Sequence, residues 1–102
     1  MDKNIIEKYI QDGICKNSKD IFIVYDDGTF EYLENFYNDD GELKGQIVNK
    51  SPDVWLQDVG NKGGVRINYG KKNASGMAAS CSFKNYDDGE LDKRWKRIDN
   101  LE

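Results

Sequence analysis

The chain has 102 residues, with 15 basic and 19 acidic side chains, no histidine and a formal net charge of −4. A chain of this length is expected to form a single domain, residues 1–102, around one core. It has no apolar run long enough to cross a membrane and no signal-peptide pattern at its start, so we expect a cytoplasmic protein without membrane segments. Histidine is the commonest general base and metal ligand. Because the chain has none, we expect a protein that is not an enzyme and that has no cofactor or metal site.

The first part of the chain predicts a helix followed by strands. Apolar residues at i, i+1, i+4 and i+5 favour a short helix over residues 2–11, with Gly13 placed to end it. Residues 21–25 are β-branched or aromatic throughout, which is typical of a central strand. Further strands are predicted over 29–37 and 43–48, separated by Asp- and Gly-rich turns.

The second part of the chain predicts three more strands and an ambiguous last segment. The strands are expected over 54–59, 65–69 and 77–86, with an irregular apolar segment as the alternative over 54–59. Residues of opposite character alternate along the last two. Apolar residues at i, i+4 and i+7 favour a helix over 90–99, and a strand is the alternative there. Residues expected in the core are Ile21, Ile23, Phe30, Ile67, Phe83 and Trp95.

These elements predict an α+β fold. We expect a mostly antiparallel sheet or partly open barrel of five or six strands, with an N-terminal helix and a C-terminal helix. The two cysteines, Cys15 and Cys81, have neither metal-site spacing nor a CxxC pattern. We therefore expect two unpaired thiols.

Charge is distributed unevenly along the chain. Residues 1–58 hold 6 basic and 13 acidic side chains, a net charge of −7, whereas residues 59–102 hold 9 and 6, a net charge of +3. Residues 59–86 contain five basic residues, five glycines and no acidic residue. Such asymmetry either indicates an anionic partner or lets the two halves neutralise each other.

Candidate binding residues follow from the basic, glycine-rich segment 59–86 and the basic run 93–97. Backbone amides in glycine-rich turns can hold an anion beside lysine side chains, and an aromatic among basic residues can stack on a nucleic-acid base. The alternative is that both segments are solvated turns, with the tryptophans in the core or at an interface. The candidates are Trp55, Lys62, Arg66, Tyr69, Lys71, Lys72, Arg94 and Arg97.

Two functions of different classes remain open at this point. The first is a small non-enzymatic protein that binds another macromolecule, with another protein as its partner. An inhibitor- or immunity-type accessory protein of bacterial or phage origin is an example of this class. The alternative is an anion-binding module for nucleic acid or a nucleotide that uses 59–86 and 93–97. One coherent positive face would favour the module, and an acidic face with exposed aromatics would favour a protein partner.

Overall fold

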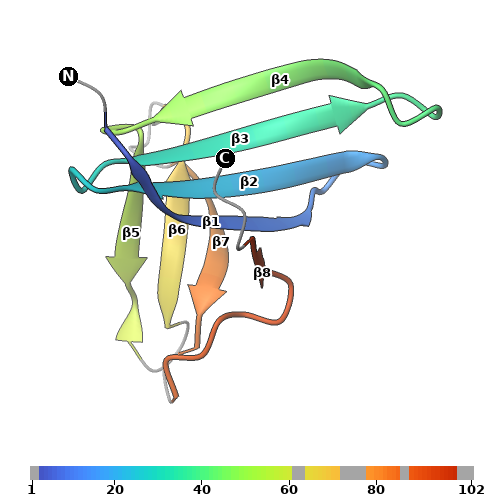
Figure 1. Cartoon of the computed structure of the whole chain (residues 1–102). Coiled ribbons are helices and arrows are strands. Elements are labelled where there is room, and N and C mark those ends of the chain that lie inside the picture. Colours follow the sequence, from blue (N-terminus) through green and yellow to red (C-terminus); the bar gives the residue numbers. More distant parts are fainter. Residues whose placement is uncertain (1–2, 61–63, 72–77, 86–87, 99–102) are drawn as a thin grey trace.

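The described part of the chain folds into two antiparallel sheets, whose strands run across one another in Figure 1. The computed structural model describes residues 3–60, 64–71, 78–85 and 88–98. The first sheet has the strand order β4-β3-β2-β1-β8, and the second has the order β5-β6-β7. The strands are β1 (Ile5–Asp12), β2 (Ser18–Tyr25), β3 (Phe30–Tyr37), β4 (Leu43–Lys50), β5 (Val54–Asp58), β6 (Val65–Tyr69), β7 (Ala79–Lys84) and β8 (Lys96–Arg97).

The predicted α+β class is wrong, and the N-terminal helix is the first correction. The segment predicted as a helix over 2–11 is instead strand β1, which pairs antiparallel with β2. The apolar spacing at Ile5, Ile6, Tyr9 and Ile10 fits one helix face, yet β-branched and aromatic residues also suit a strand. In the strand, Tyr9 lies opposite Phe22 and becomes buried.

The C-terminal helix and the barrel are the other corrections. Between residues 90 and 98 the chain forms an isolated bridge at Leu91, a turn and the two-residue strand β8. Trp95 is anchored by its indole Nε1, which donates to the Ser82 carbonyl oxygen at 2.9 Å. This bond to β7 fixes the tryptophan without a helix. The strands form two stacked sheets of five and three rather than an open barrel.

The core lies between the two sheets and is mostly aromatic. Tyr9, Phe22 and Tyr32 are neighbours in register on β1, β2 and β3, and they form the inner face of the first sheet. The rings of Tyr32 and Tyr69 stack with centroids 3.8 Å apart and planes 4° apart, which joins the two sheets. Aromatic pairs of this kind add to the stability that burial alone provides.

The core predictions are confirmed in part. Ile67, Phe83 and Trp95 are buried in this core, whereas Phe30 is only half-buried. Ile23 is buried and Ile21 half-buried on the opposite face of the first sheet. The sequence analysis did not place five buried residues in the core, and these are Tyr9, Phe22, Tyr32, Val54 and Tyr69. In the described ranges there is no helix long and apolar enough to span a membrane.

Candidate functional site

A cleft of about 470 Å³ opens where the end of β1 approaches the outer edge of β7. Side chains alternate along β7, so Ser80 and Ser82 point to one side of the strand and Cys81 points to the other. The cleft is therefore lined by residues from both sides of β7. The residues that line the cleft and carry polar or reactive groups are Gln11, Asp12, Asp20, Arg66, Tyr69, Ser80, Cys81, Ser82 and Arg94.

The floor of the cleft is a buried polar network centred on Asp20. The Tyr32 hydroxyl donates to Asp20 Oδ2 at 2.6 Å, and Gln11 Nε2 donates to the same oxygen at 3.4 Å. Burial raises the pKa of the Asp20 carboxyl, although both hydrogen bonds oppose this by favouring the charged form. Burial also raises the pKa of Tyr32 far above its ordinary range, so this phenol remains a hydrogen-bond donor.

Cys81 borders the same network and carries a free thiol. Its Sγ lies 3.6 Å from the Tyr32 hydroxyl oxygen and 3.9 Å from Gln11 Nε2. Burial raises the pKa of the Cys81 thiol, and this outweighs the opposing effects of the Tyr32 hydrogen bond and the positive charge of Arg66. Cys15 is exposed, and both cysteines are free, which confirms the prediction of unpaired thiols.

The raised pKa of Asp20 predicts a pH dependence of stability. The folded state binds the proton of the Asp20 carboxyl more tightly than the unfolded chain does. The stabilisation of the fold by this protonation is therefore complete below the unfolded pKa of about 3.9. It is lost as the pH rises through the folded pKa. We therefore expect wild-type protein to lose stability relative to Asp20→Asn as the pH rises from about 4 to 7. Urea unfolding of both proteins across this range measures the difference. The raised pKa would be contradicted if the difference in free energy of unfolding between the two proteins stayed constant with pH, or if wild type gained stability relative to Asp20→Asn.

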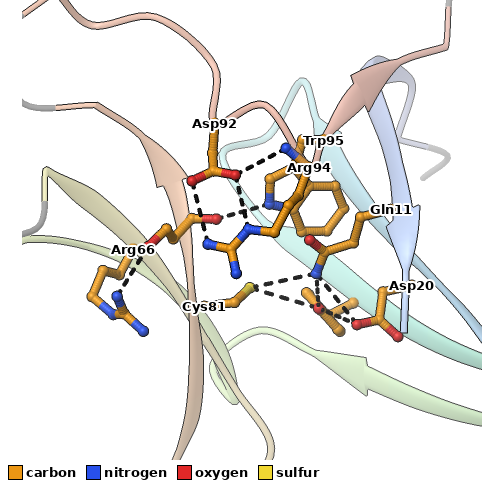
Figure 2. A network of polar contacts seen from close by, with 9 residues as sticks. Gln11, Asp20, Arg66, Cys81, Asp92, Arg94 and Trp95 are labelled. Carbon is orange, nitrogen blue, oxygen red and sulfur yellow. Dashed lines mark hydrogen bonds and ion pairs between the residues drawn. The ribbon is translucent and has the colours of Figure 1, made fainter. Parts of the chain in front are cut away.

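Arg66 and Arg94 approach the cleft from different elements. Arg66 lies on β6, and its guanidinium donates to Ser80 Oγ at 3.2 and 3.3 Å and to Ser82 Oγ at 3.1 Å. Arg94 lies in the turn after Asp92 and forms an ion pair with this carboxylate, with Nε 3.0 Å from Oδ1. In Figure 2, Arg66 lies to the left of Cys81 and the Arg94 guanidinium lies above it. Two of the predicted binding residues therefore come together here.

Among the other described binding candidates, Tyr69 also lines the cleft, whereas Trp55, Lys71 and Arg97 do not. Tyr69 lines the cleft but is 7% exposed, with its ring stacked in the core, and burial raises its pKa to about 12. Trp55 is half-buried on β5 opposite Asn68, and Lys71 is exposed just after β6. Arg97 lies on β8 over the Tyr9 ring. Lys62 and Lys72 lie outside the described residues.

The sequence analysis missed the network residues Gln11 and Asp20. Gln11 was assigned to a helix, so its side chain could not be placed beside the next strand. Asp20 lies just before the strand predicted over 21–25, but β2 begins at Ser18, and Asp20 is buried within it. Among the described residues, no group of three His, Cys, Asp or Glu side chains is placed to hold a metal ion.

A second candidate site is the face of the five-stranded sheet that points away from the core. Four apolar residues lie side by side across four strands there, in the register Ile10–Ile21–Leu33–Val48. We call this row and its register neighbours the open face. Val48 is 46% exposed, and the other three residues of the row are half-buried. The three-stranded sheet packs on the opposite face, which carries Tyr9, Phe22 and Tyr32.

A cavity of about 450 Å³ lies at one end of the open face, lined by Ile10, Lys19, Tyr37 and residues of the turn after β3. Its lining is mainly apolar, so it can take an apolar side chain from a partner. The sequence carried a signal for this face, because β2 and β3 have apolar residues on both sides. The apolar residues over 21–25 predicted a central strand, not an exposed apolar face.

Comparisons with known proteins give no further guide. No family model, no curated protein and no solved structure matches this chain.

Proposed function

We propose that this chain is a non-enzymatic binding protein that docks another protein on the open face of its five-stranded sheet. The row Ile10–Ile21–Leu33–Val48 is the observation that carries this proposal. A polar surface is usual for the outer side of an antiparallel sheet, so an apolar row across four strands supports an interaction surface. The inhibitor or immunity type of protein is the class we propose.

The size of the open face supports a protein partner. Strands β1 to β4 are neighbours of eight residues each. At ordinary strand spacing they cover roughly 19 Å by 26 Å, or about 500 Å² in projection. This approaches the roughly 800 Å² of accessible surface that each partner buries in a standard interface. The cavity beside Ile10 and Tyr37 would take one anchoring side chain.

Charge on the open face indicates the chemistry of the partner. The row next to the apolar one reads Lys8–Ile23–Glu31–Lys50 in register, so a lysine stands at each end. These two lysines are three strand spacings apart, roughly 14 Å. We therefore infer a partner with an apolar patch and carboxylates at its rim. Such rim charges contribute mainly to specificity and association rate.

We place this protein in the cytoplasm. The unpaired thiols of Cys15 and Cys81 support a reducing compartment, because exposed free cysteines are uncommon in oxidising ones.

Site-specific photo-crosslinking in the native host tests the proposal. A photoreactive amino acid replaces Val48 on the open face in one protein and Leu56 on β5 in the other. Leu56 is a matched control, because it is 37% exposed and lies on the second sheet. We expect a discrete adduct with one other protein at position 48 and none at position 56. The adduct partner, once identified and purified, should bind at least tenfold more weakly to Val48→Glu, whereas Leu56→Glu should bind as wild type does.

Three results would contradict the proposal. The first is the absence of any adduct at position 48, and the second is the same adducts at both positions. The third is an adduct between two copies of this chain, which would assign the open face to self-association.

A further inference from the structure

We propose that the cleft at the outer edge of β7 binds a small ligand that carries a carboxylate or phosphate group, through Arg66 and Arg94. This inference is independent of the protein docking proposed for the open face, because the cleft lies at the junction of the two sheets.

Arg66 is held in place by neutral partners. Its three hydrogen bonds all go to the hydroxyl oxygens of Ser80 and Ser82, at 3.1 to 3.3 Å. In the described ranges, neither of the two ion pairs involves Arg66. A guanidinium has five N–H donors, so two remain for a ligand. Because the side chain is already fixed, a bound oxyanion would order little that is still free.

The two serines add donors at the same place. Each hydroxyl accepts from Arg66 with its oxygen and still has its own proton to donate. An arginine with flanking hydroxyls matches the several lone pairs of a carboxylate or phosphate. The side chains that would hold the oxyanion therefore come from adjacent strands, since Arg66 lies on β6 and both serines lie on β7.

Arg94 supplies the second positive charge. Its ion pair with Asp92 engages Nε and one terminal nitrogen, at 3.0 and 3.3 Å, and fixes the plane of the guanidinium. The Arg94 side chain remains 61% exposed, so its other N–H donors are accessible. A ligand at the edge of β7 would receive hydrogen bonds from both arginines, one on each side of the strand.

The acidic groups around the cleft do not block anion binding by the two arginines. Asp12 forms an ion pair with Lys19, and Asp92 forms one with Arg94. Asp20 is 7% exposed and accepts from Tyr32 and Gln11 on its inner side. The raised pKa of Asp20 lowers the fraction of this carboxyl that is charged, which reduces its repulsion of an anion.

The size of the cleft points to a ligand larger than a bare ion. Its volume of about 470 Å³ falls within the range of small-molecule sites. Tyr69 and Cys81 also line the cleft and offer apolar surface and a weak sulfur contact. We therefore infer a compact organic carboxylate or phosphate monoester, with its oxyanion at Arg66.

Titration with defined anions tests the site. The probes are succinate, inorganic phosphate and adenosine monophosphate, followed by calorimetry and by the NMR signals of the arginine Nε–H and Trp95 indole groups. We expect one of them to bind at a single site and to shift these signals. Binding of succinate alone would identify a carboxylate ligand, and binding of either phosphate compound alone would identify a phosphate ligand.

Variants distinguish this site from general attraction of anions. Arg66→Gln and the double variant Ser80→Ala with Ser82→Ala should each weaken binding, the first by about tenfold or more because a charge-assisted hydrogen bond is lost. Lys44→Gln removes the same charge from exposed β4 and should leave affinity unchanged. The proposal is overturned if no probe binds at millimolar concentration, or if Arg66→Gln and Lys44→Gln weaken binding equally.

Discussion

Replacing Phe22 with alanine is expected to lower the free energy of unfolding by about 3–5 kcal/mol, as for other fully buried aromatics. Phe22 has no exposed surface and lies at the centre of the core. Its ring contacts four others, with centroid distances of 5.2 to 6.4 Å, and these belong to Tyr9, Phe30, Phe83 and Trp95. The truncation would leave a cavity between the two sheets, and the close-packed strands cannot shift enough to fill it. Urea denaturation followed by circular dichroism measures the loss.

Phe30→Ala is the matched control for this experiment. Phe30 stacks on Phe22 at 5.5 Å but is only half-buried at the edge of the core, so its loss should cost less. Equal losses for the two variants, or a loss below about 1 kcal/mol for Phe22→Ala, would show that the core is not centred on Phe22.

Most strands could be predicted from the sequence because local patterns mark them. Residues 65–69 were predicted with the observed bounds, and the predicted strands over 21–25, 29–37, 43–48, 54–59 and 77–86 overlap observed ones. In these segments the alternation of apolar and polar residues and the turn residues between them agree. A local pattern of this kind is enough to identify a strand, but it does not identify the sheet that the strand joins.

The two predicted helices failed where long-range contacts decide the structure. The spacing of Tyr9 and Ile10 from the isoleucines before them fits a helix face equally well, and only pairing with β2 selects the strand. Trp95 is buried through a hydrogen bond to Ser82, thirteen residues earlier. Neither contact has a signature in the local sequence.

The candidate site likewise combines a residue that the local sequence indicates with others that only long-range pairing brings together. Arg66 could be identified because basic residues concentrate in one glycine-rich segment. The other cleft residues Gln11 and Asp20 could not be identified, because they reach the cleft only through the β1–β2 hairpin. The open face was also hidden, because it depends on the register across four strands.

The hairpin that carries this network imposes a steric requirement at Gly13. Gly13 N donates to the Ser18 carbonyl oxygen at 2.9 Å and so closes the turn between β1 and β2. A Cβ atom at position 13 would lie 2.1 Å from Ser18 Oγ and 3.2 Å from Asp20 Oδ1. Ser18 is buried, and its hydroxyl donates to the Cys15 carbonyl oxygen at 2.7 Å, so it cannot move aside freely.

Gly13→Ala is therefore expected to lower the free energy of unfolding by about 1–3 kcal/mol, the usual cost of overpacking. Gly45→Ala is the control, since Gly45 also lies outside the left-handed region and its Cβ would meet nothing within 4 Å. That variant should be neutral or slightly stabilising. Ser18→Gly removes the clashing side chain, so the double variant should lose less stability than the sum of the two single variants. Additive losses in this cycle, or equal stability of Gly13→Ala and Gly45→Ala, would contradict the close packing of Gly13 against Ser18.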